Sequence, residues 1–451
     1  MSEMKEIEMN EDFCISTCTP NCEKGIYDNK KLNPSTGGKK KDMRDLLSVR
    51  STEPTDNFGE IKIEDIRNFS EKQDLQTIMF TKPSTHVFHS TDFLLTVAPN
   101  ISEDLISTQN LTEIQNLAQH LKGGITSFFG FESRLNSTKA RSDYLIAVSS
   151  QKGEREALLN AIRNGNLPKE FSKQKEWHQV RELTEQWANP SSILHKNILG
   201  LWLEFDTADE DIETPVPNIF LQTIPLRIDS PEDVEKCTWV TRDAIPILTG
   251  SKVSEKLENK FINALEKLPK GASVFHVASM IARDCEGMRL VIKRIKPEDI
   301  VPYLESIGWK DNNENELTKL LKDIKDFSNC IRLHINISEH VDPKIGLECF
   351  ISPDKYHEGN GWNEFFNYLV NKNLCLPNLG SALLQFPGVA QEDVSKEFTF
   401  DLYMPSVKIE GNDFSKALVR YISHVKISYN PNKSVEAKAY TGVRLFGMSE
   451  A

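Results

Sequence analysis

Charged side chains and imidazoles alternate with aliphatic side chains in several short runs of this chain. In the run Cys330–Ser338, Arg332 and His334 fall on one side of an extended strand, because successive strand side chains point to opposite faces. The run Lys344–Ser352 repeats this alternation and places Glu348 on its polar side. A cation, an imidazole and a carboxylate that share a face could bind an anion and transfer a proton.

The same alternation recurs elsewhere, so the set of polar-face residues grows. Leu199–Asp206 and Met288–Ile295 place aliphatic side chains on one face and charged or aromatic side chains on the other. Val425–Tyr429 and Val435–Phe446, which a turn at 430–433 separates, do the same. Together the polar faces hold five basic side chains, three groups able to exchange a proton, and three aromatic rings: Arg289, Lys293, Arg332, Lys426 and Lys438; Glu204, His334 and Glu348; and Trp202, Phe350 and Tyr440.

Amphipathic helices are expected between pairs of such strands. Helical spacing of apolar residues occurs in Leu105–Leu121, Glu154–Ile162, Trp177–Trp187, Val253–Leu268, Asn315–Phe327 and Trp362–Asn371. The expected strand pairs are Ile125–Leu135 with Ser142–Ser149, Leu199–Asp206 with Asn218–Ile224, Ser273–Arg283 with Met288–Ile295, Cys330–Ser338 with Lys344–Ser352, and Val425–Tyr429 with Val435–Phe446. The segment Gly388–Asn412 fits neither pattern.

About five αββα units therefore predict an α+β fold. Apolar strand faces pack against helices, and ten strands in a row would leave two exposed edges that closure removes. We predict a ten-stranded antiparallel β-barrel with helices outside, formed by residues 86–451 as one domain. A polar, mostly disordered extension is expected over residues 1–85. The alternative is a set of open antiparallel sheets that helices cover on one face, with the charges in water.

In a closed barrel the basic side chains would converge on one lumen. Two like charges ~6 Å apart at an effective dielectric constant of ~20 repel by roughly 3 kcal/mol. Glu204 and Glu348 cannot offset five cations, so a polyanion such as a diphosphate is expected among them. A barrel of ten strands is wide enough to hold a ligand.

Composition narrows the classes of function. The chain has 451 residues, 39% of them hydrophobic and 27% charged, which suits a folded soluble protein. A formal net charge of −12 argues against a general nucleic-acid binder. No run approaches the roughly 20 apolar residues that span a bilayer, so no membrane association is expected. Cysteines scattered singly on apolar strand faces are typical of a reducing compartment, which predicts a cytoplasmic location.

This pattern resembles the ABBA (αββα) prenyltransferases, whose helices surround a ten-stranded antiparallel barrel. The resemblance is architectural and covers about Leu105–Phe446. It implies that Arg289, Lys293, Arg332, Lys426 and Lys438 bind the diphosphate of an isoprenoid donor. It also implies that Glu204 or Glu348 is the carboxylate beside the acceptor, that Trp202, Phe350 and Tyr440 shield the allylic cation, and that a glutamate or His334 takes the proton. The chain departs from the family in having 23 Phe and only 9 Tyr.

The resemblance implies a transferase of secondary metabolism. It would move an isoprenoid from its diphosphate to an aromatic small molecule or a peptide side chain. It would require no cofactor, although Mg²⁺ is compatible with a diphosphate, and no protein metal site is expected. The alternative is a non-catalytic peptide-binding or scaffold protein of a ribosomal peptide pathway. A third option is another enzyme that acts on a phosphorylated small molecule.

Other motifs in the sequence give weaker indications of function. Cys14, Cys18 and Cys22 are spaced Cys-x3-Cys-x3-Cys, which differs from the Cys-x3-Cys-x2-Cys spacing of iron–sulfur radical enzymes and lacks a nearby fourth ligand for zinc. Neither a glycine-rich nucleotide-binding motif nor Gly-x-Ser-x-Gly is present in the sequence.

Overall fold

A computed structural model of the protein describes residues 76–80, 90–121, 124–150, 153–163, 167–208, 215–283, 287–310, 314–328, 330–351, 361–392, 414–431 and 433–449. Cys14, Cys18 and Cys22 lie outside the described residues, as does most of the extension expected over residues 1–85. The division of the chain at residue 85 therefore stays a prediction.

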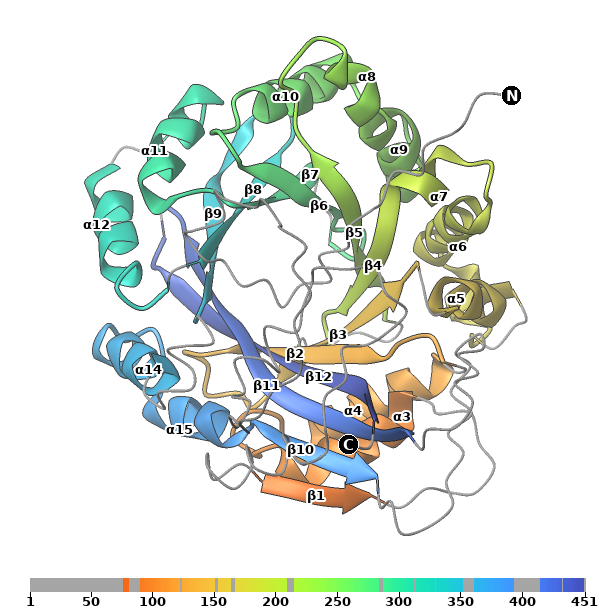
Figure 1. Cartoon of the computed structure of the whole chain (residues 1–451), viewed down its shortest axis with the longest axis vertical. Helices are drawn as coiled ribbons and strands as arrows, with labels where there is room; N and C mark the ends of the chain where they lie inside the picture. The colour runs from red at the N-terminus through yellow and green to blue at the C-terminus, as the bar shows by residue number, and fades with distance from the viewer. Residues whose placement is uncertain are drawn as a thin grey trace, which may run out of the picture.

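Ten strands form a closed antiparallel barrel, and all neighbouring pairs around it run in opposite directions (Figure 1). The strands, in chain order, are β2 (Phe128–Arg134), β3 (Ser142–Ser149), β4 (Ile198–Phe205), β5 (Pro217–Leu226), β6 (Ser273–Ser279), β7 (Met288–Lys293), β8 (Cys330–Ile337), β9 (Val341–Phe350), β11 (Phe414–Tyr429) and β12 (Glu436–Ser449). The predicted ten-stranded barrel is confirmed, and the open-sheet alternative is wrong.

Closure depends on the length of β11. Its residues Val425–Tyr429 pair with β9, and on its other edge β11 pairs with β12. The sequence predicted only this second half of the strand. The first half extends beyond the barrel, where β10 (Gly388–Glu392) pairs with β11 and β1 (Gln76–Phe80) pairs in parallel with β10. Neither β1 nor β10 was predicted, because both are short and lack a clear alternation.

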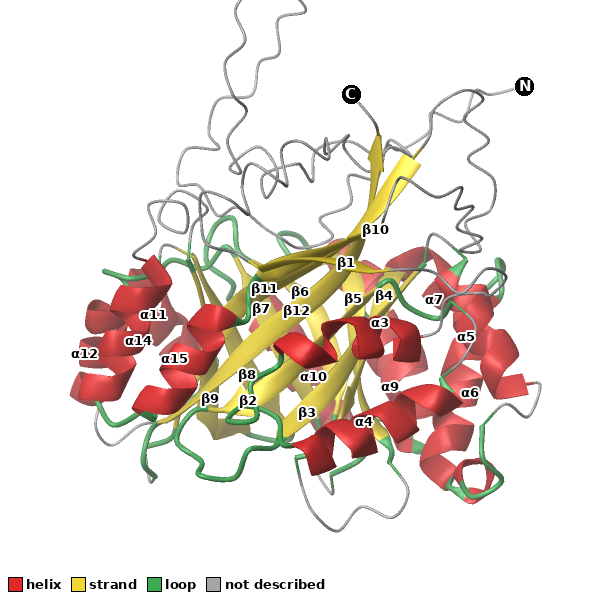
Figure 2. Ribbon diagram, turned by 90° about the horizontal axis from the view of Figure 1, so that it is seen from below, coloured by secondary structure: helices red, strands yellow, loops and turns green. Residues whose placement is uncertain are grey.

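Helices surround the barrel and cover the outer faces of its strands (Figures 1 and 2). They are α3 (Ser90–Val97), α4 (Thr108–His120), α5 (Glu154–Arg163), α6 (Lys175–Ala188), α7 (Ile193–Asn197), α8 (Asp233–Cys237), α9 (Ile245–Thr249), α10 (Glu255–Glu266), α11 (Pro297–Ser306), α12 (Glu314–Ile324), α14 (Gly361–Asn371) and α15 (Pro377–Gln385), with short 3₁₀ turns at Ala98–Asn100 and Phe171–Lys173 and a π-helical turn at Val240–Ala244. All six predicted helices are present.

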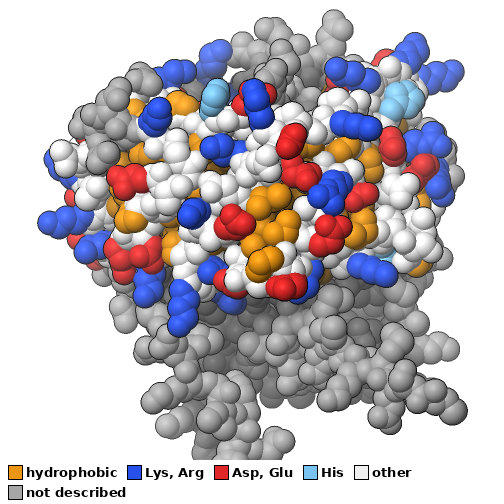
Figure 3. Space-filling view, turned by 90° about the horizontal axis from the view of Figure 1, so that it is seen from above, with side chains coloured by type: hydrophobic (Ala, Val, Ile, Leu, Met, Phe, Trp, Pro, Cys, Tyr) orange, Lys and Arg blue, Asp and Glu red, His pale blue; other side chains and the backbone are white. Residues whose placement is uncertain are grey.

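Local sequence explains where several helices begin. The hydroxyl oxygens of Ser107 and Ser254 accept hydrogen bonds from the backbone N–H groups of Asn110 and Leu257, which caps α4 and α10. Pro297 stands in the first turn of α11, where its missing N–H costs nothing. No described helix is both long enough and apolar enough to cross a bilayer. The outer face seen in Figure 3 carries basic and acidic side chains intermixed.

The hydrophobic core lies between the helices and the outward faces of the strands. Leu203, Leu333 and Leu347 are fully buried there, while Trp202, His334 and Glu348 beside them in sequence point into the lumen. The predicted alternation of faces is confirmed for β4, β8 and β9. The polar side chains that the sequence marks therefore line the inside of the barrel.

Leu347 lies at the closure, because its backbone neighbours are Leu333 of β8 and Ile427 of β11. Leu347→Ala should lower the free energy of unfolding by about 2–5 kcal/mol, since a fully buried leucine leaves a cavity. Leu384→Ala is the control, because Leu384 is 37% exposed, and it should change the stability by about 0.5 kcal/mol or less. Urea unfolding of both variants tests the placement, and equal costs would contradict it.

Candidate active site

The lumen contains two adjoining cavities. The aromatic cavity has a volume of about 110 Å³, counted as the space that the centre of a water molecule can occupy. The residues that line it include Phe128, Trp202, Phe220, Arg332, Phe350 and Tyr440. The ionic cavity, with about 60 Å³ by the same measure, is lined among others by Glu132, Arg283, Arg289, Asn336, Lys344 and Lys438. Glu204, His334 and Lys426 line both cavities and thus mark their border.

The structure brings the predicted site residues into one lumen but divides them between the two cavities. Arg332, Glu348, Trp202, Phe350 and Tyr440 line the aromatic cavity. Arg289 and Lys438 line the ionic cavity. Lys293 belongs to neither lining set; its ammonium lies 5.5 Å from the ring centroid of Phe275. Arg289 and Lys293 are four residues apart on β7, which corresponds to about 13 Å along a strand.

Arg332 lies between two aromatic rings. Its guanidinium carbon is 4.1 Å from the centroid of Phe350 and 4.8 Å from that of Phe275, so both ring faces stabilise the cation. Its Nη1 also lies 3.7 Å from Oε2 of Glu348. Arg332 is 5% exposed, and this arrangement makes it part of the wall of the aromatic cavity.

Glu348 is the centre of a cluster of imidazoles. His334 Nε2 lies 2.5 Å from Oε1 of Glu348, and His424 Nε2 lies 3.5 Å from the same oxygen. The ring of His424 stacks on Tyr440 at 4.3 Å and lies 4.8 Å from Phe350. Carboxylate, imidazoles and aromatic rings therefore form one continuous surface of the lumen.

Burial controls the protonation of the lumenal bases. Burial, followed by the charge of Arg332, lowers the pKa of His276 to about 3. Burial also lowers the pKa of His424 to about 4, although Glu348 opposes this shift. Burial, followed by the charge of Arg289, lowers the pKa of Lys426 to about 8. At neutral pH the lumen thus holds neutral imidazoles and a lysine that is close to losing its proton.

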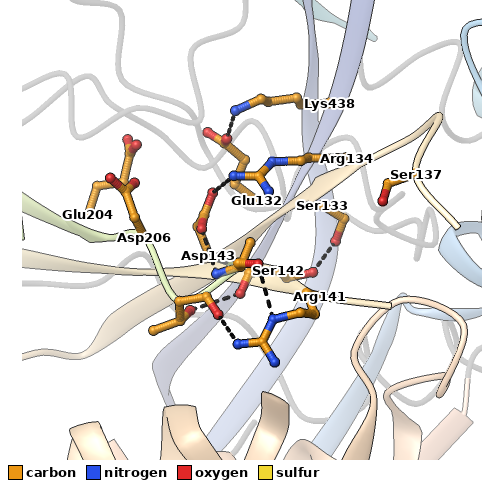
Figure 4. Close-up of polar contacts among 12 residues, drawn as sticks. Glu132, Ser133, Arg134, Ser137, Arg141, Ser142, Asp143, Glu204, Asp206 and Lys438 are labelled. Atoms are coloured by element: carbon orange, nitrogen blue, oxygen red, sulfur yellow. Dashed lines mark hydrogen bonds and ion pairs between the residues drawn. The ribbon is translucent and has the colours of Figure 1, made fainter. Parts of the chain in front are cut away.

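Carboxylates gather at the ionic end of the lumen, more of them than the sequence indicated (Figure 4). Glu132 accepts hydrogen bonds from Lys438 and from the hydroxyl of Tyr440. Arg283 donates to Oε1 of Glu204 at 2.9 Å and to Oδ2 of Asp206 at 2.8 Å. The expectation that only two glutamates face five cations is wrong, because Glu132 and Asp206 pair with cations as well.

The charges of these carboxylates shift one another's pKa values. Burial pushes the pKa of Glu132 upward, but the charges of Lys438 and Lys426 outweigh it and hold the pKa well below its usual range. Burial, followed by the negative charge of Glu132, raises the pKa of Glu204. The same two causes raise the pKa of Asp143 to about 8. Clustering of negative charge therefore disfavours the ionised forms of Asp143 and Glu204.

Gly346 provides the space in which the side chain of Lys426 passes over the inner face of β9. A Cβ atom at this position would lie 2.7 Å from Cε of Lys426 and 3.2 Å from Cβ of His334. Gly346 pairs with His334 on β8 and with Ser428 on β11. The absence of a side chain at this crossing lets Lys426 reach the border of the two cavities.

Sequence reasoning missed several lumenal residues. Glu132 was within a predicted strand, and its alternation with Gly130 and Arg134 was a usable signal. Arg283 follows the end of β6, where alternation no longer predicts direction. His276 and His424 were missed because bulges between Val274 and His276 and between Ile422 and His424 break the alternation.

Metal binding finds no support in the described part of the chain, where no group of three or more His, Cys, Asp or Glu side chains is arranged to hold an ion. The conclusion does not extend to Cys14, Cys18 and Cys22, which lie outside it.

Comparison with known proteins finds distant structural neighbours and no relative in sequence. No family model and no curated protein matches the chain. A crystal structure of PriB in a binary complex with product diphosphate is 11% identical, covers 79% of this chain and 94% of its own, and has a TM-score of 0.45. AnaPT from Neosartorya fischeri is 10% identical, covers 79% and 92%, and has a TM-score of 0.42. The closed ten-stranded antiparallel barrel itself follows from the strand pairing of this chain. The roles of individual residues stay predictions.

Asp143→Asn should stabilise the protein above neutral pH. The pKa of Asp143 is raised to about 8 in the folded protein. As the pH rises, the unfolded chain therefore releases this proton at a lower pH than the folded protein does. The stability that the protonated form provides is complete below pH ~4 and is lost as the pH rises toward ~8. At pH 8 the variant should exceed the wild type by on the order of 2 kcal/mol. Urea unfolding at pH 5 and pH 8 checks this.

The control for this prediction is Asp323→Asn. The hydrogen bond from Lys372 lowers the pKa of Asp323, so this variant should not gain stability at either pH. A wild type and an Asp143→Asn variant with parallel pH profiles would contradict the assignment.

Proposed function

We propose that the protein is a prenyltransferase that moves an isoprenoid from its diphosphate to an aromatic acceptor. The observation that carries this proposal is the border between the two cavities, where Lys426 lies beside both. On one side of Lys426 the ionic cavity is lined by Arg283, Arg289 and Lys438 together with two carboxylates. On the other side aromatic rings line the cavity, with Arg332 among them. An isoprenoid diphosphate has the same division, because its charged head and its hydrocarbon tail meet at the carbon that reacts.

The ionic cavity supplies the diphosphate site in this proposal. Among the described residues Arg289 and Lys426 form no ion pair within 4 Å. Arg289 Nε donates to Oδ1 of Asn336 at 2.9 Å, which fixes its direction. Lys426 is buried and Arg289 is partly buried. A buried cation without an ion pair is costly, and an anion between the two side chains would reduce that cost. Lys438 would contribute as well, although Glu132 already neutralises part of its charge.

The two remaining cations of the predicted diphosphate set have a different position. Arg332 and Lys293 both lie against Phe275, next to the aromatic cavity. We assign them to the rim of the donor site, where they raise the local potential for a polyanion without direct contact being required. Their roles and those of the other predicted residues rest on position alone.

The chemistry would be electrophilic substitution. The C–O bond of the donor breaks, and its electron pair leaves with the diphosphate, which the cations stabilise. The rings of Trp202, Phe350 and Tyr440 would surround the allylic cation and keep water away. The acceptor's aromatic carbon then forms the new bond, and one of Glu204, Glu348 or His334 takes the released proton. The positive charge comes from side chains, and Mg²⁺ remains compatible with a bound diphosphate.

The acceptor and the cellular setting are part of the proposal. The aromatic cavity would accept an indole, a phenol or an aromatic peptide side chain, in a cytoplasmic pathway of secondary metabolism. A second candidate function is a peptide-binding or scaffold role without catalysis. The observation in its favour is that Glu132, Glu204 and Asp206 already pair with lumenal cations.

Substitution of the unpaired cations tests the donor site. Lys426→Met and Arg289→Gln should each weaken binding of dimethylallyl diphosphate about 10- to 100-fold, because a charged hydrogen bond contributes about 1.5–3 kcal/mol. Wild-type affinity should also fall as the pH rises above about 8, where Lys426 loses its proton, and Lys426→Met should lack that fall. Titration calorimetry measures both effects.

A matched control is Lys372→Gln, since Lys372 pairs with Asp323 on the outer surface. It should bind the diphosphate as the wild type does. Tight binding of a peptide that neither Lys426→Met nor Arg289→Gln affects, together with no diphosphate binding, would favour the scaffold function.

Gly346→Ala tests the path of Lys426 without removing a charge. The added methyl group would displace Cε of Lys426, so the variant should lose about tenfold in affinity for dimethylallyl diphosphate. Gly380→Ala in α15 is the control, because its Cβ would meet Phe366 at an ordinary 3.5 Å. Unchanged calorimetric affinity in Gly346→Ala would place the diphosphate elsewhere.

A further inference from the structure

His334 and Glu348 form a carboxylate–imidazole pair inside the barrel. They lie on neighbouring strands, β8 and β9, and are 5% and 8% exposed. The distance from His334 Nε2 to Glu348 Oε1 is 2.5 Å. The guanidinium of Arg332 lies 3.7 Å from the other oxygen of Glu348 and helps to hold the pKa of this carboxyl well below its usual range.

This contact decides which imidazole nitrogen carries the proton. An ionised carboxylate can only accept a hydrogen bond, so Nε2 of His334 must donate to it. The other nitrogen, Nδ1, then holds a free lone pair. Among the described residues Nδ1 of His334 has no hydrogen-bond partner although it is buried. A buried polar atom without a partner calls for an explanation, and a proton acceptor that a substrate reaches after a small shift of the lumenal side chains provides one.

The position of His334 suits that role. His334 and Lys426 both line the aromatic and the ionic cavity, so the imidazole stands where donor and acceptor would meet. Burial, followed by the charge of Lys426, lowers the pKa of His334 to about 3. The imidazole is therefore neutral at physiological pH and a weak base, which the strongly acidic cationic ring of the acceptor can still protonate.

We propose that Nδ1 of His334 accepts the proton that the aromatic acceptor releases, and that Glu348 positions the imidazole for this step. The inference deepens the proposed function and rests on it. It chooses one base among the three candidate groups and makes Glu348 a positioning residue, which acts through His334 and does not touch the substrate.

The step balances as follows. The donor's C–O bond breaks and the diphosphate leaves with the electron pair. A π-electron pair of the acceptor ring forms the new C–C bond to the allylic carbon. The ring is then cationic, and its newly bonded carbon carries both the prenyl group and its original hydrogen. The C–H bond then breaks, its electrons restore the aromatic ring, and the proton moves to Nδ1 of His334. The resulting imidazolium is stabilised by Glu348 through Nε2–H and by the negative diphosphate nearby.

Other groups in the lumen fit this role less well. His424 Nε2 is also buried without a hydrogen-bond partner, but it faces Oε1 of Glu348 at 3.5 Å and not the border of the cavities, and its Nδ1 is 3.0 Å from the hydroxyl of Ser423. His276 lines the aromatic cavity but is not at the border. Glu204 is at the border and its pKa is raised, but its Oε1 already accepts a hydrogen bond from Arg283 at 2.9 Å.

The first test reads the tautomer without any reaction. In the full chain labelled with ¹⁵N-histidine, the signal that His334→Gln removes should show a protonated Nε2 and an unprotonated Nδ1 at pH 7. In Glu348→Gln this preference should be lost or weakened. A protonated Nδ1 on His334 in the wild type would overturn the inference.

The second test separates donor cleavage from proton removal, with dimethylallyl diphosphate as donor and ring-deuterated indole and phenol as acceptors. His334→Gln should bind the donor as the wild type does and still release diphosphate slowly to water. Transfer should fall about 10²- to 10⁴-fold, the range typical of a lost general base. A primary deuterium isotope effect that is absent in the wild type should appear. Glu348→Gln should show the same isotope effect with a smaller loss.

His424→Gln is the matched control, because His424 contacts the same carboxylate oxygen. It should transfer without an isotope effect. Full transfer by His334→Gln, or an isotope effect that appears in Glu204→Gln instead, would overturn the inference and leave the proposed function intact. A wild type that neither binds nor cleaves dimethylallyl diphosphate would overturn the proposed function and this inference together.

Discussion

Closure of the sheet through β9 and β11 is the constraint on which the rest of the structure depends. Each strand buries its aliphatic face against helices, so its other face must point toward whatever lies on the far side. In an open sheet that would be water, and the charges would be screened. Because β11 pairs with both β9 and β12, the polar faces meet one another across a lumen of low dielectric constant. Strand pairing thereby gathers the polar side chains of alternating strands into one lumenal site.

Charges in such a space must be neutralised, and the barrel does this unevenly. Lys438 and Arg283 have carboxylate partners, and Glu348 lies near Arg332 and two imidazoles. Arg289 and Lys426 form no ion pair within 4 Å among the described residues, although Lys426 lies opposite Glu348 in the pairing of β11 with β9. A buried cation without a counter-ion lowers stability, so its retention at the border of two cavities is more consistent with a ligand site than with a structural role.

Sequence alone could predict the fold because its main signal is local. Alternation in β4, β8 and β9 fixes which side chains point inward, and helical spacing between the strands fixes the outer layer. Alternation cannot reveal which inward charges neutralise one another, because that depends on strands far apart in sequence. Glu132 meets Lys438 across the pairing of β2 with β12, 306 residues away. The distribution of net charge in the lumen is therefore a property of closure.

The bulge in β11 shows how one residue can decide the chemistry of a barrel. Tyr421 and Ser423 point inward before it, and His424 and Lys426 point inward after it. In a regular strand a shift by one residue exchanges the two faces, so without the bulge His424 and Lys426 would point toward the helices. There a lysine ammonium would be buried among aliphatic side chains at a prohibitive cost. The first half of β11 pairs with β10 outside the barrel and the second half closes it. The same irregularity that hides His424 from sequence analysis brings Lys426 to the border of the two cavities.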